Sequence, residues 1–338
     1  MIKNVLIGAG AVTGLMASVA GAQTLQQVQD NGTLRCGVNP GLTGFSSTDA
    51  DGNWVGFDVD VCRAVAAAVL EDPMAVEFVS TTPQTRFSAL SSGEVDMLVR
   101  NTTWTFTRDV DLANEFTGIN YYDGQGFLVP AELGVESAMD LDGATVCIQT
   151  GTTTELNLSD FFSANNMDYE PVPIESAAEA QQQYLARACD VYTSDTSGLA
   201  ASRASFENPD DHVILPEVIS KEPLGPLVSE GNPAWADIVR WSLNAMIAAE
   251  EYGITSENVA DMAENSNNPE VNRILGSEGN LGEQLGLDAE WAQRIIAGVG
   301  NYGEVFAEHI GPETPVGLER GQNALWTEGG LLYAPPFR

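Results

Sequence analysis

The chain is poor in positive charge. It has 14 lysines and arginines against 48 aspartates and glutamates, which gives a formal net charge of −34 at pH 7, and lysine occurs only at Lys3 and Lys221. Such a polyanionic surface repels phosphate backbones and anionic lipid surfaces, so we expect no nucleic-acid partner. Because 43% of the residues are apolar, the chain is not a disordered acidic tail.

Histidine and paired cysteines are scarce as well. The only histidines are His212 and His309, and no two cysteines form a C-x-x-C pair. This composition argues against a zinc site, and we expect neither a metal nor a cofactor. No Ser-His-Asp set and no pair of catalytic carboxylates can be assembled from the motifs.

The first residues have the features of an export signal. Lys3 supplies early positive charge, Val5 to Val19 is mostly apolar, and Ala20-Gly21-Ala22 has the small-x-small form of a cleavage site. The apolar run is too short and too rich in glycine and alanine to span a membrane stably. Within it, Gly8 to Gly14 mimics a dinucleotide-binding fingerprint, but no strand-length segment precedes it. The sequence therefore favours a signal peptide, a mature start at Gln23 and a periplasmic protein.

Export predicts that the cysteines form disulfide bonds, because an oxidising envelope favours such bonds. The four cysteines are Cys36, Cys62, Cys147 and Cys189, and they allow three pairings. Cys36 lies in the first strand candidate and Cys62 in the first helix that would pack on it, whereas the other two lie in later strand candidates. We therefore expect Cys36–Cys62 and Cys147–Cys189, one bridge in each lobe. The alternative is four buried thiols.

The apolar periodicity predicts alternating strands and helices. Because the mature chain is longer than one hydrophobic core usually supports, we expect two α/β lobes. The first series has strands at 34–38, 76–80 and 95–99 and helices at 58–70 and 85–92. The second has strands at 145–149, 169–173 and 191–193 and helices at 155–164 and 177–188. The apolar segment Gly126 to Pro130 is predicted to cross between the lobes.

The last part of the chain is predicted to be a helical extension. Amphipathic segments lie at 258–264, 287–296 and 302–307. Its expected aromatic anchors are Trp291, Trp326, Tyr333 and Phe337. We expect this extension to pack on the first lobe.

A run of hydroxyl, amide and guanidinium groups follows the strand predicted at 95–99. It begins at Arg100-Asn101-Thr102-Thr103 and ends at Arg108. Open α/β sheets bind ligands at the carboxyl ends of their strands, and the planar fork of an arginine suits a carboxylate. The second series ends in the same manner, at Ser194-Asp195-Thr196. A ligand between the two ends would meet Arg108 and Asp195, the charges that a zwitterionic α-amino acid needs.

At these residues the chain resembles the periplasmic solute-binding proteins of amino-acid ABC transporters, solute-binding protein family 3. The resemblance covers residues 33–250 and is most specific at Gly56 to Cys62, Leu90 to Arg108 and Gln149 to Thr153. Asn101 to Thr105 and Asn120 to Phe127 resemble the general L-amino-acid and glutamate/glutamine/aspartate/asparagine binders, which have a longer carboxyl-terminal region.

The resemblance implies a type II periplasmic binding protein, with two Rossmann-like lobes, two crossing hinge segments and a helical extension. Residues 1–22 would be the signal peptide, 23–126 and 229–338 the first lobe with the extension, and 131–222 the second lobe. The protein would be a monomer that captures L-amino acids and delivers them to an ABC permease in the membrane.

The resemblance also implies roles for individual residues. Arg108 matches the arginine that holds the ligand α-carboxylate, and Thr103 the hydroxyl residue five positions before it. Asn101 occupies the place whose backbone carbonyl receives the α-ammonium. Thr153, in Gly151-Thr152-Thr153, matches the threonine of the second lobe that closes on the carboxylate, and Asp195 the acid that pairs with the ammonium.

The predicted side-chain pocket is roomy and polar. Narrower members of the family sandwich the ligand between aromatic residues, and the matching positions here are Leu42 and Pro83. Further candidates for contact with the ligand are Asn39, Phe45, Gln84, Arg86, Arg100, Gln149 and Gly151. Because Arg86 and Arg100 can meet an acidic side chain, we expect broad binding of L-amino acids that favours acidic and amide ligands.

Two rival functions remain open at this point. Some proteins of this fold are dehydratases that act on prephenate-like acids, and Glu155 or Asp195 could serve as the acid or base. A sensory receptor could use the same cleft without transport, although no membrane span follows the signal region. The motifs favour the transport binding protein.

Overall fold

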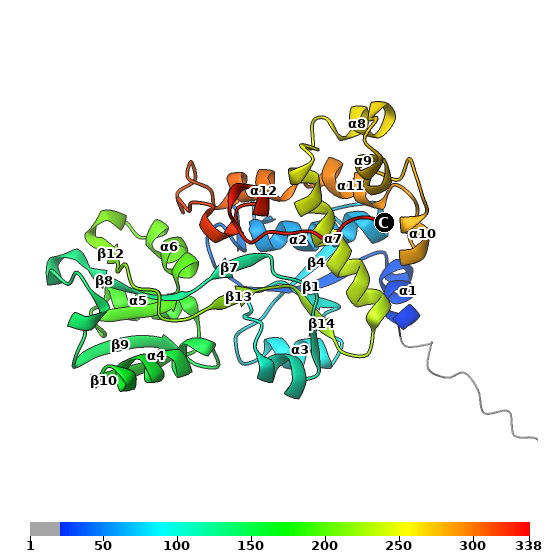
Figure 1. Ribbon diagram of the computed structural model, residues 1–338. Helices are drawn as coiled ribbons and strands as arrows, with labels where there is room; N and C mark the ends of the chain where they lie inside the picture. Colours follow the sequence, from blue (N-terminus) through cyan, green and yellow to red (C-terminus); the bar gives the residue numbers. More distant parts are fainter. Residues whose placement is uncertain (1–20) are drawn as a thin grey trace, which may run out of the picture.

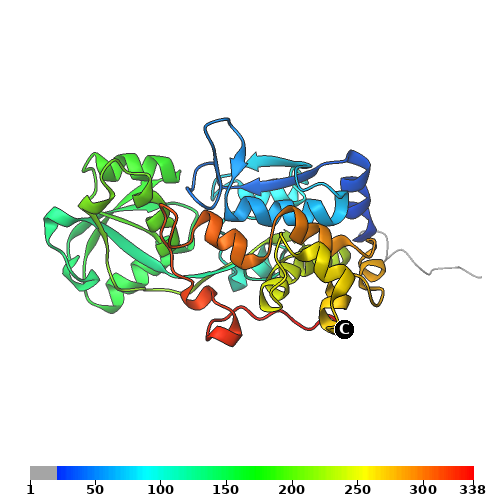
Figure 2. The ribbon, with the colours of Figure 1, turned by 90° about the horizontal axis from the view of Figure 1, so that it is seen from above.

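The computed structural model describes residues 21–338, so the predicted signal peptide lies almost entirely outside the described residues. Two α/β lobes lie side by side, each built on a five-stranded sheet (Figure 1). The extension, coloured yellow to red, covers the lobe that carries the first sheet (Figure 2). None of the helices in this range is long and apolar enough to cross a bilayer.

The sheet of lobe 1 has the strand order β4-β1-β5-β14-β6. Its strands are β1 (Leu34–Val38), β4 (Val76–Ser80), β5 (Met97–Leu98), β6 (Asn114–Phe116) and β14 (Leu227–Ser229). β4, β1 and β5 are parallel, and β14 runs antiparallel to both β5 and β6. The main helices of lobe 1 are α2 (Phe57–Leu70), α3 (Arg86–Ser91) and α7 (Pro233–Glu251).

Lobe 2 repeats this strand order as β10-β9-β11-β8-β12. Its strands are β8 (Gln125–Pro130), β9 (Ala144–Gln149), β10 (Tyr169–Ile174), β11 (Val191–Asp195) and β12 (His212–Ile214), and its helices are α4 (Thr153–Ala164), α5 (Ala177–Leu185) and α6 (Thr196–Ala204). β10, β9 and β11 are parallel, and β8 is antiparallel to β11 and β12. In both lobes the parallel strands therefore end at one edge, where the polar motifs follow.

Two short antiparallel strands connect the lobes, β7 (Tyr121–Asp123) and β13 (Glu222–Leu224) (Figure 1). The prediction that Gly126 to Pro130 crosses between the lobes is wrong, because this segment belongs to β8 inside the second sheet. Phe127 and Leu128 of β8 are buried in clusters on opposite faces of that sheet, which explains the continuous apolar run. We therefore propose that lobe 2 begins at Gln125 rather than at residue 131.

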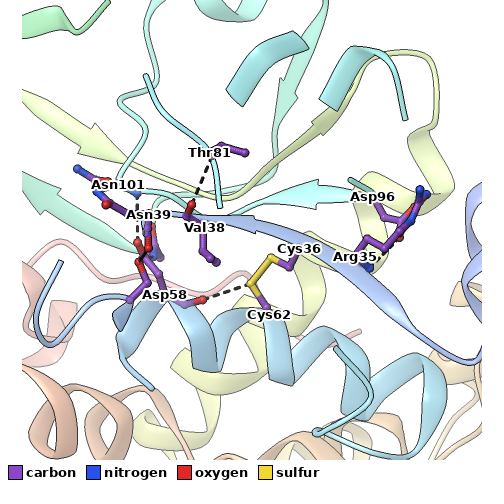
Figure 3. The surroundings of a disulfide bond; sticks show 11 residues. Arg35, Cys36, Val38, Asn39, Asp58, Cys62, Thr81, Asp96 and Asn101 are labelled. Carbon is purple, nitrogen blue, oxygen red and sulfur yellow. Dashed lines mark hydrogen bonds and ion pairs between the residues drawn. A yellow bond between two sulfur atoms is a disulfide. The ribbon is translucent and has the colours of Figure 1, made fainter. Parts of the chain in front are cut away.

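Each lobe contains one disulfide bond, as expected. Cys36 of β1 is bonded to Cys62 of α2, with 6.2 Å between their Cα atoms (Figure 3). Cys147 of β9 is bonded to Cys189, with a Cα–Cα distance of 5.6 Å. The first bond fixes a helix on a strand, and the second joins β9 to the turn that leads into β11. Neither bond links the lobes, so both leave the hinge free.

The extension packs mainly on α2 and α7 of lobe 1. It consists of α8 (Val259–Asn265), α9 (Pro269–Ile274), α10 (Leu281–Leu285), α11 (Trp291–Gly298) and α12 (Tyr302–His309). Trp291 and Phe337 are buried anchors, as predicted. Trp326 and Tyr333 are 48% and 63% exposed, so their prediction as anchors is wrong. They contact each other edge to face on the surface instead of entering the core.

The remaining elements are short or peripheral. They are α1 (Gly21–Asn31), the hairpin β2 (Ser47–Thr48) and β3 (Trp54–Val55), a π-helical turn at Thr107–Asp111, and 3₁₀ turns at Ala131–Leu133, Ala138–Asp140, Pro209–Asp211, Gly321–Asn323 and Trp326–Glu328.

Candidate ligand-binding site

A small cavity lies between the lobes, where the carboxyl ends of both sheets face each other. It is lined by Arg86, Arg100, Asn101, Thr103, Arg108, Gln149, Thr152, Thr153, Thr154, Ser194 and Asp195. Its volume is about 20 Å³, on the scale of one or two water molecules. An amino acid can therefore enter only when the lobes part or the long side chains of the wall move.

The lobe 1 wall of the cavity contains three buried arginines. Arg86 begins α3, Arg100 follows β5, and Arg108 lies in the π-helical turn. Each donates a hydrogen bond to a neutral oxygen: Arg86 Nη1 to Thr102 Oγ1 at 3.2 Å, Arg100 Nε to the Thr81 carbonyl at 2.9 Å, and Arg108 Nη1 to the Thr103 carbonyl at 3.0 Å. Within residues 21–338 none of the three forms an ion pair.

The surroundings of these guanidinium groups disfavour their charged form. Burial is the main cause that lowers the pKa of all three, and repulsion between the arginines lowers the pKa of Arg86 and Arg100 further. The pKa of Arg100 falls to about 10, so its side chain is still a cation at neutral pH. The Nε of Arg86 is buried without a hydrogen-bond partner among the described residues. An anion in the cavity would relieve this repulsion and supply the missing acceptor.

Asp58 at the start of α2 holds the loop that presents Asn101. The Asn101 N–H donates to Asp58 Oδ2 at 3.1 Å, and Asn120 Nδ2 donates to Oδ1 at 3.0 Å. Asn39 Nδ2 donates to the side-chain oxygen of Asn101 at 3.2 Å, so Asn39, Asp58 and Asn101 lie close together (Figure 3). Asn101 has a positive φ of 34°, which asparagine tolerates better than most residues. Burial raises the pKa of Asp58 to about 6.

The lobe 2 wall contributes one carboxylate, Asp195 at the end of β11. Its side chain is buried and accepts no hydrogen bond from the part of the chain that the structure describes. Burial, followed by the nearby charges of Asp123 and Glu222, raises the pKa of Asp195 well above its ordinary value, although Arg108 and Arg86 oppose the shift. The Asp123 carboxylate already accepts a hydrogen bond from Thr196 Oγ1 at 2.6 Å. Asp195 is therefore the acid that lacks a donor, and a cationic group in the cavity would supply one.

A second carboxylate, Glu222 of β13, lies behind the cavity wall. Its Oε2 accepts hydrogen bonds from Thr103 Oγ1 at 2.6 Å and Thr153 Oγ1 at 2.9 Å. The sequence reasoning missed this residue. Its threonine partners lie 119 and 69 positions away in the chain, so no local pattern could point to it.

The structure places seven of the eleven predicted ligand-binding residues on the cavity wall. They are Asn101, Arg100, Arg108, Thr103, Gln149, Thr153 and Asp195. Arg86 also lies there, as do Thr152, Thr154 and Ser194, which the sequence reasoning did not select. These three residues could have been predicted because they are neighbours of Thr153 and Asp195 in the chain.

Four predicted residues lie off the wall. Gln84 Nε2 bonds Thr150 Oγ1 of lobe 2 at 2.6 Å and so bridges the mouth of the cleft. The carbonyl of Gly151 faces Arg86 Nη2 at 3.5 Å. Asn39 supports Asn101, and Leu42 is buried in the lobe 1 core.

The sequence around this cavity matches a known family. The model of the bacterial extracellular solute-binding proteins, family 3, matches residues 34–258. The chain belongs to this family. The relatives that match over their whole length are named as binding proteins and not as enzymes, and this chain is likewise a solute-binding protein and not an enzyme.

Full-length relatives share the extension as well. The glutamate/glutamine/aspartate/asparagine-binding protein of Rhodobacter capsulatus is 60% identical over 338 residues and covers 100% of both chains. The general L-amino acid-binding periplasmic protein of Rhizobium johnstonii is 53% identical over 342 residues, again with 100% of both chains. Among solved structures, an ABC transporter periplasmic binding protein from Brucella ovis with glutathione bound has a TM-score of 0.91 and 53% identity, over 93% of this chain and 99% of that chain.

Proposed function

We propose that this solute-binding protein captures free L-amino acids between its lobes and delivers them to the permease of an ABC transporter. It acts as a monomer in the periplasm after export through the signal peptide. Two features support this proposal: the relatives that match over their whole length are named as amino-acid binders, and the cavity carries charges of both signs on opposite walls.

The observation that carries the proposal is the charge balance of the cavity. Arg108 on one wall faces Asp195 on the other, and neither has an ion-pair partner within residues 21–338. An L-amino acid would place its α-carboxylate against Arg108 and its α-ammonium against Asp195, so that each buried charge gains a partner. Thr103, Asn101 and Thr153 line the space between these charges.

The other two arginines bias the choice of side chain. With one α-carboxylate on Arg108, Arg86 and Arg100 still lack an anion, and they suit a side-chain carboxylate or amide oxygen. We therefore propose glutamate, glutamine, aspartate and asparagine as ligands, with the acidic pair bound more tightly. Glutathione is a second candidate because of the Brucella ovis relative, and it carries both a zwitterionic α-amino acid end and an additional carboxylate.

A thermal-shift panel tests this function. We expect the four L-amino acids to raise the melting temperature, with glutathione as the comparison ligand. D-glutamate and 2-oxoglutarate should give much smaller shifts. The α-keto acid has no ammonium group and leaves Asp195 without a partner, whereas the D-enantiomer has the same groups but cannot present all three to their partners at once. Mass spectrometry should recover every ligand chemically unchanged. A response to one amino acid alone, or turnover of prephenate or arogenate, would contradict the proposal of a broad transport receptor.

A further inference from the structure

Glu222 bonds both lobes at once from its place on the hinge strand β13. The residue is only 1% exposed and does not line the cavity. Oε2 accepts from Thr103 of lobe 1 and Thr153 of lobe 2, while Oε1 accepts from Asn157 Nδ2 of α4 at 2.6 Å and from Ser220 Oγ at 2.7 Å. All four neighbours are able to donate, as an acceptor-only carboxylate requires.

This network determines which way the two threonine hydroxyls point. A hydroxyl has one hydrogen and two lone pairs. Because Thr103 and Thr153 both give their hydrogen to Glu222, their oxygens can only accept from a ligand in the cavity. The α-ammonium of an amino acid is a donor with three hydrogens, whereas a carboxylate could not bond to these oxygens.

We propose that Glu222 is a positioning residue with two linked effects. It joins the closed lobes through charge-assisted hydrogen bonds, and it turns the hydroxyls of Thr103 and Thr153 into acceptors that select for the α-ammonium. This inference rests on the proposed function and changes the role that the resemblance implied for Thr153, since the ligand carboxylate is left to Arg108 and the other arginines.

The decisive variant is Glu222→Gln. Asn157 and Ser220 can still donate to the amide oxygen, which places the amide NH₂ where Oε2 now lies, facing the threonines. That NH₂ donates to the hydroxyl oxygens, so their hydrogens turn toward the cavity. The variant keeps the volume of the side chain but reverses the hydrogen-bonding polarity of the two hydroxyls and removes the charge that joins the lobes.

The matched control is Glu217→Gln. Glu217 also accepts two hydrogen bonds, from Ser137 Oγ at 2.6 Å and the Ala138 N–H at 3.0 Å, but both donors belong to lobe 2. Calorimetry would compare L-glutamate with glutarate, the same dicarboxylate without the ammonium group. Small-angle scattering would measure the radius of gyration without added ligand.

For Glu222→Gln we expect the preference for glutamate over glutarate to fall about tenfold, since one ammonium contact becomes unfavourable. The radius of gyration without ligand should increase because the open state gains population. Glu217→Gln should match the wild type in both measurements. A preference within threefold of the wild type overturns the polarity role, and an unchanged radius overturns the joining role.

A second variant tests the joining role in case Glu222→Gln does not fold. Asn157→Leu removes one lobe 2 donor without touching the cavity wall, and its radius should lie above that of the wild type. An unchanged radius in this variant would also overturn the joining role. If the wild type binds no amino acid at all, the proposed function fails, whereas the scattering comparison still tests Glu222 by itself.

Discussion

Lobe 1 and lobe 2 are built on sheets with the same strand order, but they contribute opposite charges to the cavity between them. Lobe 1 supplies three guanidinium groups that repel one another, and lobe 2 supplies the carboxylate of Asp195. A ligand that bears both charges can satisfy the two walls only when they come together. The difference between the lobes therefore couples recognition to closure, because the binding free energy depends on contacts with both sides.

The lobes also differ in how they are supported. The core of lobe 1 continues through α2 and α7 into the extension, with Trp291 and Phe337 buried in it. The sheet of lobe 2 is covered by smaller clusters, one around Phe162 and another around Tyr184. Lobe 1 is thus the heavier body, and we expect lobe 2 to be the part that moves when the cleft opens.

The largest expected effect comes from removing the lobe 1 charge that faces Asp195. Arg108→Ala should weaken L-glutamate binding at least thirtyfold, since truncating one partner of a buried charged hydrogen bond typically costs about 2–5 kcal/mol. Calorimetry with L-glutamate and L-glutamine measures this loss.

The matched control for this variant is Arg187→Ala in lobe 2. Arg187 pairs with Glu132 on the surface, at 2.6 Å, and both side chains are exposed. Its removal should change the affinity by less than a factor of two. Affinity within a few-fold of wild type for Arg108→Ala, with the melting temperature of a folded protein, would refute the assignment of Arg108 to the ligand carboxylate.

The charge of lobe 2 should make binding depend on pH. The pKa of Asp195 is raised above its ordinary value, and an ammonium ion binds the ionised form. Below the raised pKa the carboxyl group must lose its proton before it can pair, so affinity should fall by up to about tenfold per pH unit as the solution becomes more acidic. Calorimetry in buffers of different ionisation enthalpy should detect proton release on binding within this window.

The stability of the protein without ligand should change in the opposite sense. A raised pKa means that the folded state holds the Asp195 proton more tightly than the unfolded state, so this contribution to stability is lost as the pH rises through the window.

Asp195→Asn should weaken ligand binding and also flatten the pH dependence of the affinity. If the variant kept the wild-type slope, another group would be responsible for the proton release.

The sequence predicted the regular parts of both lobes well where the signals were local. Strands β1 and β4 have the predicted bounds, because short segments rich in apolar residues end there at polar turns. Strand β8 was misassigned since a buried strand that ends at Pro130 gives the same apolar run as a crossing segment. Asp195 was found because it lies at the end of a predicted strand, and Arg108 because it closes the polar run that follows another.

The contacts that join distant segments could not be predicted from local sequence patterns. Glu222 is bonded to two threonines that come from different lobes. Asn323 in the extension meets the hinge across 201 positions of the chain. Periodicity describes the face of an element, whereas the partner of a polar side chain depends on how the lobes are placed in space.

The smallest expected effect tests the support that lobe 1 gives to the hinge. Asn323 bonds both backbone groups of Tyr122 in β7: the Tyr122 N–H donates to Oδ1 at 2.6 Å, and Nδ2 donates to the Tyr122 carbonyl at 3.0 Å. Asn323→Ala removes both hydrogen bonds and should lower the free energy of unfolding by about 1–3 kcal/mol, or the melting temperature by a few degrees. Asn265→Ala is the control, because Asn265 makes one exposed bond to Asp261 in the same extension and should change stability by less than about 0.5 kcal/mol. Asn323 does not line the cavity, so glutamate affinity should stay within about threefold of wild type. If Asn323→Ala instead weakened binding as much as Arg108→Ala, the extension would take part in recognition, and the division between a charged cleft and a supporting lobe would have to be abandoned.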